Sequence, residues 1–276
     1  MKVKEIMTGD TVYAEVPGSA TEALELIVKT GVSGLPVVKR GTKELLGIVT
    51  REDFSRNPEE NQLALLMTQD VVTISRDEDV KKAADIFLNA DFRRLPVVEN
   101  SQLIGIMTVS DIVWRAVGKM GIEEPVKKLV SSNITAIWGE TPLKVAFEIL
   151  RLSKHRAVPV LDSDGRLSGM ISDMDLLKGA QLTESTKKSE MSGSSEGEKW
   201  GWDSKNVIYI TKKRLEIQDK KVNEVMIKDV ITATKKTPIS DCARKMAKNR
   251  VEHIPIIDAE GNMIGVVRDV DLLRTL

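Results

Sequence analysis

Four aspartates stand at equivalent places in the sequence, each six residues after a glycine. A hydroxyl side chain precedes three of them by three residues, and Arg268 takes that place before the fourth. An ionised carboxylate at such a place can accept hydrogen bonds from ligand hydroxyl groups. The same spacing is also a capping box, which satisfies free N–H groups at the start of a helix. The pairs are Thr50 and Asp53, Thr108 and Asp111, Ser172 and Asp175, and Arg268 and Asp271.

Each glycine follows an apolar-Pro-apolar core, so the whole pattern is written four times. The anchoring prolines are separated by 96 − 36 = 60, 159 − 96 = 63 and 255 − 159 = 96 residues, the last interval being enlarged by an insertion. Self-similarity at such a period is the signature of a repeat protein. We predict repeats at 1–57, 60–120, 121–180 and 220–276, with a linker at 181–219. The cores are Leu35-Pro36-Val37-Val38, Leu95-Pro96-Val97-Val98, Val158-Pro159-Val160-Leu161 and Ile254-Pro255-Ile256-Ile257.

Within each repeat the apolar pattern predicts a β-α-β-β-α unit. Before each proline, apolar residues recur at helical spacing, as in Ala20, Ala23 and Ile27, and the helix starts are placed at Ser19, Asp79, Thr141 and Thr237. Two short apolar runs around a turn follow, and then a second helix. The first strands are expected at 11–13, 71–74, 134–136 and 230–232. Such an α+β (or α/β) unit cannot cover its own sheet, so we expect repeats 1 with 2, and 3 with 4, to pack as pairs.

Composition narrows the classes of function. Lys plus Arg equals Asp plus Glu at 41 each, which argues against a nucleic-acid partner. One cysteine excludes an intramolecular disulfide framework, the first residues lack a long apolar stretch, and no apolar run approaches a membrane span, so we expect a cytoplasmic protein without membrane insertion. Two histidines argue against a metal site, and no phosphate-binding Gly-rich loop is present. We therefore expect no enzyme activity.

The repeat resembles the CBS domain, a family named for cystathionine β-synthase. The resemblance rests on Met7-Thr8, Met67-Thr68 and Met226, on the apolar-Pro-apolar core, and on Gly-x-x-Thr/Ser-x-x-Asp. It implies pseudo-two-fold pairs of β-α-β-β-α domains, two of which would complete a disc. The layout is similar to that of the gamma subunit of AMP-activated protein kinase and of stand-alone prokaryotic CBS proteins. The resemblance implies binding of adenosine-containing ligands in a regulatory role.

The resemblance also implies roles for individual residues. Asp53, Asp111, Asp175 and Asp271 would contact the ribose, whose cis-diol suits a carboxylate. Thr50, Thr108 and Ser172 would offer hydroxyls to phosphate or ribose, whereas Arg268 would either clamp a phosphate or fill the pocket and leave it empty. Residues just before the proline core would reach phosphates from across a pair, with solvated surface side chains as the alternative; the candidates are Arg93, Arg94, Arg156 and His253.

Adenine would be flanked by residues at the first strand, which could equally be core residues. The candidates are Val72, Thr73, Ile134, Thr135, Ile231 and Thr232. From this uneven supply of polar groups we expect repeats 2 and 3 to have the best-equipped sites and repeat 4 to be altered or empty.

The insertion changes composition part of the way along. Residues 181–206 are rich in Ser, Gly, Glu and Lys, which is typical of a flexible linker, and Trp200 and Trp202 then precede an apolar stretch. We predict a short hairpin from Val207–Thr211 and Leu215–Ile217, with Lys212-Lys213 at its turn. It is either an ordered connector or a docking element for a partner.

Three functions compete. The first is a sensor that binds AMP, ADP, ATP or an S-adenosylmethionine-like compound and changes the activity of an unknown partner protein in trans. The second is a scaffold with empty clefts, and the third, least supported, is a nucleic-acid-binding protein. A homodimer remains open under each of them.

Overall fold

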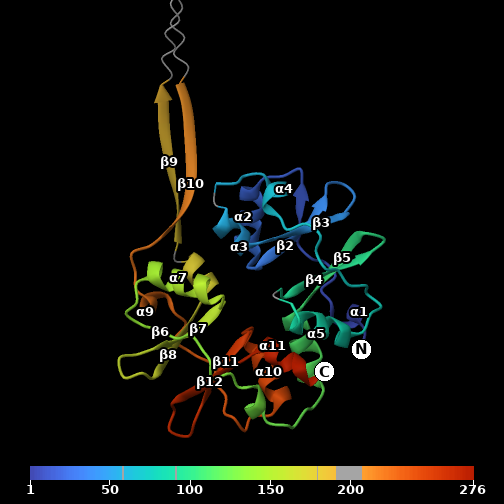
Figure 1. The fold of residues 1–276 in the computed structure, drawn as a ribbon, viewed down its shortest axis with the longest axis vertical. Coiled ribbons are helices and arrows are strands. Elements are labelled where there is room, and N and C mark those ends of the chain that lie inside the picture. The colour runs from blue at the N-terminus through green and yellow to red at the C-terminus, as the bar shows by residue number, and fades with distance from the viewer. Residues whose placement is uncertain (58, 91, 179, 191–206) are drawn as a thin grey trace, which may run out of the picture. The chain divides into compact units, whose positions relative to one another are not determined.

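Four times along the chain, a short helical turn leads into a first strand or bridge, a longer helix, an antiparallel strand pair and a second helix (Figure 1). This computed structural model describes residues 1–57, 59–90, 92–178, 180–190 and 207–276. The order within each repeat is the predicted β-α-β-β-α order. Where the first strand reduces to a single bridge, it is formed by Ile74 in repeat 2 and Ala233 in repeat 4.

The elements of repeats 1 and 2 are α1 (Val3–Ile6), β1 (Ala14–Val16), α2 (Ala20–Thr30), β2 (Gly34–Lys39), β3 (Leu45–Thr50), α3 (Arg51–Arg56), α4 (Leu63–Leu66), α5 (Val80–Leu88), β4 (Arg94–Glu99), β5 (Gln102–Thr108) and α6 (Val109–Arg115). Repeat 3 contains β6 (Ile137–Trp138), α7 (Leu143–Ser153), β7 (Ala157–Leu161), β8 (Leu167–Ser172) and α8 (Asp173–Lys178). An insertion with β9 (Ala180–Glu190) and β10 (Val207–Ile217) follows. Repeat 4 contains α9 (Val222–Val225), α10 (Ile239–Asn249), β11 (His253–Ile257), β12 (Met263–Arg268) and α11 (Asp269–Leu272). Short 3-10 turns are η1 (Val117–Lys119), η2 (Val126–Leu129) and η3 (Leu273–Thr275).

The longer helices begin where the sequence predicts, within one residue. Ser19 caps α2 by accepting a hydrogen bond from the Glu22 N–H (3.1 Å), and Asp79 stands at the N-cap of α5. In α7 and α10 the N-cap is Pro142 and Pro238, so the predicted caps Thr141 and Thr237 were one residue too early. Each helix buries the stripe that predicted it, for example Ala20, Ala23 and Ile27 in α2.

The first strands of repeats 1, 3 and 4 begin just after the predicted ranges, whereas in repeat 2 the bridge residue Ile74 is the last residue of the predicted range 71–74. All four have the same offset from the strand with which they pair. Ala14 pairs with Val37, Ile74 with Val97, Ile137 with Val160 and Ala233 with Ile256, each a separation of 23 residues. The prediction followed apolar residues such as Val12 and Val72, which are exposed. The buried side chain that sets the register comes just after them.

The segment that leads into each repeat pairs with the other member of its pair rather than with its own repeat. Thr8 forms a β-bridge with Ile106, and Thr68 forms one with Ile48. The repeated glycine makes room for this approach, because a methyl group on Gly105 would lie 2.7 Å from the Thr8 carbonyl oxygen and 3.3 Å from Met7 Sδ. The equivalent bridges of repeats 3 and 4 are Ser131 with Val266 and Ile227 with Met170.

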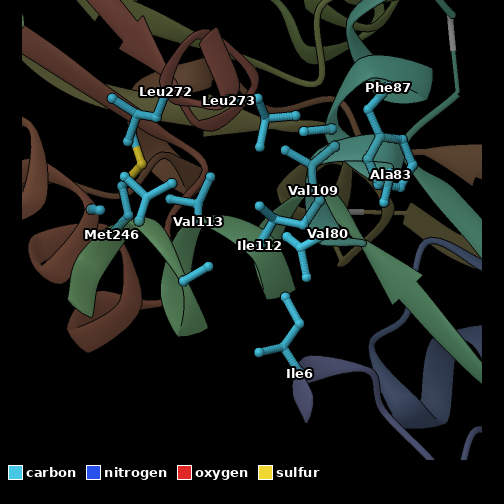
Figure 2. Close-up of a cluster of buried hydrophobic side chains, with 14 of the residues drawn as sticks. Ile6, Val80, Ala83, Phe87, Val109, Ile112, Val113, Met246, Leu272 and Leu273 are labelled. Carbon is cyan, nitrogen blue, oxygen red and sulfur yellow. The ribbon is translucent and has the colours of Figure 1, made fainter. Parts of the chain in front are cut away.

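The chain divides into two units, of which the first comprises residues 1–134 and 231–276. In this unit α5 and α6 of repeat 2 and α10 and α11 of repeat 4 contribute to one hydrophobic core. Figure 2 shows Met246 and Leu272 of repeat 4 near Val113 of repeat 2, with Phe87 and Val80 further along the same cluster. Repeat 1 has a separate core centred on Ile27, Leu35 and Val49. Repeats 2 and 4 are therefore held together by apolar packing.

The second unit, residues 135–230, contains repeat 3, α9 and the insertion. Here the predicted hairpin was wrong: Val207–Ile217 is one continuous strand that pairs antiparallel with Ala180–Glu190 over its full length. No Gly, Pro, Asn or Asp lies between Val207 and Ile217, so this stretch offers no favoured turn residue. The polar composition of 181–190 concealed the partner strand. The Gly- and Ser-rich stretch at 192–197, Trp200 and Trp202 lie outside the described residues.

Candidate functional site

The four candidate sites share a backbone frame. In each repeat the first residue of one strand lies opposite the last residue of the next, because the two strands run antiparallel. This places the predicted cation position directly across from the predicted hydroxyl position. The four pairs are Gly34 with Thr50, Arg94 with Thr108, Ala157 with Ser172, and His253 with Arg268.

In repeats 1 and 3 the aspartate caps its helix with one oxygen and keeps the other free. The N–H and hydroxyl of Thr50 donate to Oδ2 of Asp53 (2.7 and 2.8 Å), and those of Ser172 donate to Oδ2 of Asp175 (2.9 and 2.6 Å). Among the residues that the structure describes, Oδ1 of Asp53 and of Asp175 accepts no hydrogen bond. Capping and ligand contact are therefore compatible in these two repeats.

In repeat 2 the corresponding carboxylate is more enclosed. Asp111 is 7% exposed, and its Oδ2 accepts from the N–H and hydroxyl of Thr108 (2.9 and 2.6 Å). Its Oδ1 accepts from the Thr8 hydroxyl (3.4 Å) and lies 3.7 Å from an Arg115 nitrogen. Burial raises the pKa of Asp111, against the opposing effect of the Thr108 hydrogen bond and the Arg115 charge. Both oxygens of Asp111 thus have partners from the chain itself.

In repeat 4 the carboxylate is paired with a cation. Arg268 donates from Nε to Oδ2 of Asp271 and from Nη2 to Oδ1, both at 2.9 Å, and its backbone N–H donates to Oδ2 at 3.1 Å. The hydrogen bond to Asp271 is the main reason that the pKa of Arg268 is raised. Asp271 is 6% exposed, so this fork holds a carboxylate that is almost fully buried.

Arg94 extends from repeat 2 into repeat 1. The side chain is buried, and its Nη2 donates to the Ser33 hydroxyl. A methyl group on Gly34 would lie 2.7 Å from Arg94 Nη1 and 3.1 Å from the Cα of Thr50. The absence of a side chain at Gly34 therefore admits the guanidinium beside Thr50. Ser33 and Gly34 provide no positive charge to repeat 1, and Arg94 of repeat 2 provides it instead.

The adjacent Arg93 extends in a different direction, from repeat 2 to repeat 4. Its Nη2 lies 2.5 Å from Asp269 Oδ2 and 3.1 Å from Glu252 Oε2, and its side chain is 18% exposed. Although burial opposes its charge, the two carboxylates raise the pKa of Arg93. Complete burial, together with Glu252, raises the pKa of Asp269 to about 6 despite Arg93. The guanidinium of Arg93 is committed to this ion triad.

The remaining cation candidates lie in separate units. Arg156 is half-buried directly before β7, and its carbonyl accepts a hydrogen bond from the Asp173 N–H (2.9 Å). His253 is half-buried and opens β11, opposite Arg268. A role for either side chain in phosphate binding stays a prediction.

The adenine candidates lie just before the first strands and outside the buried core. Val72 is 47% exposed, and Thr73 is also exposed. Ile134, Thr135, Ile231 and Thr232 are half-buried. In repeats 2, 3 and 4 these side chains are thus partly or largely accessible, although Ile231 also packs against the core, to which the neighbouring Ile74 and Ala233 belong.

Sequence reasoning missed Thr8 and the partner of Arg93. Thr8 precedes repeat 1 yet reaches the aspartate of repeat 2, and the repeated Met-Thr at 7–8 and 67–68 was the available signal. Over the described residues, no cluster of His, Cys, Asp and Glu is arranged to hold a metal ion. In the same part of the chain no helix has the length and apolarity to cross a membrane.

Comparison with known proteins identifies the repeats. The family model of the CBS domain matches residues 3–60, 63–118, 126–181 and 222–276. The uncharacterised protein MJ1225 of Methanocaldococcus jannaschii is 26% identical over 299 aligned residues, which cover 99% of this chain and 97% of that protein.

Solved structures give the same result. The crystal structure of an uncharacterised conserved protein from Pyrococcus horikoshii is 30% identical, with a TM-score of 0.68 and coverage of 100% of this chain and 99% of that one. The structure of MJ1225, described as a proposed archaeal homolog of g-AMPK, matches with a TM-score of 0.77 at 21% identity, over 100% of this chain and 99% of that one. The chain therefore belongs to the CBS domain family and carries four CBS domains.

Proposed function

We propose that this protein is a regulatory sensor that binds an adenosine-containing ligand between paired repeats and modulates a partner protein in trans. Candidate ligands are AMP, ADP, ATP and S-adenosyl compounds. The observation that carries the proposal is that Asp53 and Arg94 both lie next to Thr50. A half-buried carboxylate with a free oxygen and a buried guanidinium from another repeat meet at the same short stretch of backbone, beside Thr50.

This arrangement suits a nucleotide because its two ends need opposite charges. The free Oδ1 of Asp53 can accept from a ribose hydroxyl, and a guanidinium can donate two parallel hydrogen bonds to a phosphate. The exposed apolar Val72 follows Thr68, which pairs with β3 beside this site, so it can contact the base. A site built from two repeats would also sense their separation, as a regulator requires.

The geometry changes the expected order of the sites. From the sequence we expected repeats 2 and 3 to be best equipped. Asp111 of repeat 2 has both oxygens engaged, whereas Asp53 and Asp175 each keep one free, so we propose repeats 1 and 3 as the principal sites. Asp111 would bind more weakly, because a ligand would have to displace Thr8.

Isothermal titration calorimetry with AMP, ADP, ATP and S-adenosylmethionine tests the proposal. D53N keeps a capping oxygen but removes the charge, and R94Q removes the cation. Each should weaken the ligand of repeat 1 by about 10- to 150-fold, which corresponds to about 1.5–3 kcal/mol for a hydrogen bond to a charged group.

The matched control is E52Q, which neutralises an exposed carboxylate beside Asp53 that pairs only with Arg56 (2.6 Å) among the described residues. Affinity should be unchanged in E52Q. Absence of heat with all four ligands at high protein concentration would contradict the proposal and favour a scaffold with empty clefts. Equal affinities of D53N and the unmodified protein would assign Asp53 to capping alone.

A further inference from the structure

Repeat 4 differs from the other three in the partner of its aspartate. In repeats 1, 2 and 3 a hydroxyl and an N–H donate to one carboxylate oxygen. In repeat 4 a guanidinium donates to both oxygens of Asp271, and the backbone N–H of the same residue donates as well. Both oxygens of Asp271 therefore already accept a charged hydrogen bond from Arg268, whereas only one oxygen of Asp53 and of Asp175 accepts hydrogen bonds from the described residues.

The position of Arg268 explains how the side chain reaches the carboxylate. It is the last residue of β12 and stands three residues before Asp271, at the place of Thr50, Thr108 and Ser172. The Thr50 and Ser172 hydroxyls each donate to one carboxylate oxygen, whereas the longer Arg268 side chain reaches both oxygens of Asp271. Because both groups belong to one turn of chain, the pair forms within the repeat and needs no outside partner.

Asp271 is the main charged partner of Arg268. Asp269 also favours the charged form of Arg268, and Arg93, which pairs with Asp269, opposes it. A bidentate guanidinium–carboxylate pair is stronger and more directional than a hydrogen bond between neutral groups. An incoming diol would have to replace this charged donor with two neutral hydroxyls.

We propose that Arg268 is a built-in occupant of the repeat 4 site, so that this repeat takes no adenosine ligand and residue 268 sets how many ligands one chain binds. The inference rests on the proposed function for the other repeats. It assigns Arg268 a role opposite to that of a phosphate clamp, in which its guanidinium would attract the ligand.

A reciprocal exchange tests this assignment. R268T restores the Thr-x-x-Asp sequence of repeats 1 and 2, and S172R introduces the arginine into repeat 3, where the residue directly opposite, Ala157, is uncharged. The number of AMP molecules bound per chain is measured by equilibrium dialysis up to millimolar AMP, with folding checked by circular dichroism. We expect one additional AMP in R268T and one fewer in S172R.

The control is R151T, which removes an exposed arginine from another pair three residues apart, Glu148 with Arg151 (2.6 Å), and should bind as the unmodified protein does. An unchanged number in R268T would overturn the inference, and a smaller one would establish the phosphate clamp instead. If R268T does not fold, undiminished binding in folded S172R overturns the inference.

The same experiment separates this inference from the proposed function. If the unmodified protein binds none of AMP, ADP, ATP and S-adenosylmethionine but R268T binds one AMP, the proposed function fails and the occupant role of Arg268 stands. If neither protein binds any of the four ligands, both fail. If the unmodified protein binds AMP and R268T binds no more, only the inference fails.

Discussion

Replacement of Arg93 by methionine should destabilise the protein through one buried carboxylate. R93M keeps an unbranched apolar side chain of similar length but removes the charge that faces Asp269 and Glu252. Asp269 is fully buried and, within the described part of the chain, would retain only the Ser110 hydroxyl (3.4 Å) and the Val270 N–H (2.7 Å) as donors. The variant therefore tests how much the ion triad between repeats 2 and 4 contributes to the free energy of unfolding.

The magnitude follows from the pKa of Asp269. Its rise from 3.8 to about 6 already costs the folded protein about 3 kcal/mol at neutral pH, at about 1.4 kcal/mol per pKa unit. Without Arg93 the pKa rises further, but the cost is capped at about 1.4 × (7 − 3.8), or about 4 kcal/mol, because the carboxyl then takes up a proton. The ionisation of Asp269 thus adds at most about 1 kcal/mol to the effect of R93M at pH 7.

Loss of the hydrogen bonds of Arg93 adds about 1–3 kcal/mol, so R93M should lower the free energy of unfolding by about 2–4 kcal/mol at pH 7. The sign of the pH dependence is fixed by the raised pKa of folded Asp269. Asp269 lowers the stability of the folded protein as the pH rises from the ordinary pKa of 3.8 through the folded-state pKa of about 6. In R93M the folded-state pKa is higher, so stability is lost over a wider pH range. At pH 5 the carboxyl of Asp269 is mostly protonated in both folded proteins, so the effect of R93M should shrink by up to about 1 kcal/mol.

Urea unfolding at pH 7 and pH 5 measures these differences. The control is D269N, in whose background R93M should show the same effect at both pH values, because no carboxyl remains to titrate at that position. An effect of R93M that is equal at pH 7 and pH 5 in the otherwise unmodified protein would refute the argument. So would a loss below about 1 kcal/mol, since that is less than one buried hydrogen bond provides.

Two further predictions concern close packing. G34A places a methyl group 2.7 Å from Arg94 Nη1 and from the Val49 carbonyl oxygen, so it should cost about 1–3 kcal/mol of stability, lower the thermal midpoint and weaken ligand binding in repeat 1. The control G9A, which has open space around the added methyl group, should have neither effect. Equal thermal midpoints of the two variants would contradict this argument. Burial raises the pKa of Cys242 to about 12, so the native thiol should not react with a thiol reagent at pH 8 but should react in urea, and rapid native labelling would show that α10 does not bury it.

The local elements could be predicted because their causes are local. The stripe of Ala20, Ala23 and Ile27 reports a helix with one buried face, whatever packs on it. The turn at Asp164-Gly165 joins two apolar runs into a hairpin, and the structure has both strands there. Repetition of these signals, together with the repeated motifs, was sufficient to recognise the resemblance to the CBS domain family.

The partners of individual side chains could not be predicted in the same way, because a pattern shared by all four repeats does not indicate which repeat packs against which. Arg93 and Arg94 are neighbours of the same type, yet one binds repeat 4 and the other enters repeat 1. The difference depends on the empty space at Gly34 and on the buried Asp269, both far away in sequence. The first strands of repeats 1, 3 and 4 were misplaced for a related reason, since apolar residues such as the exposed Val12 outweighed the small buried Ala14 and Ala233.

The segment before each repeat forms a β-bridge with the paired repeat, and this sets an order of events during synthesis of the chain. Thr8 can form its β-bridge only after Ile106 has been synthesised, 98 residues later (106 − 8). Ser131 can form its bridge only after Val266 has been synthesised, 135 residues later (266 − 131). At about 5–20 residues per second, the second interval lasts roughly 7–27 s. Throughout it, the ribosome must also produce the insertion while Ser131 has no β-partner. The carboxyl-terminal half of the protein is therefore where slow translation or an early stop would expose an unpaired backbone edge for longest.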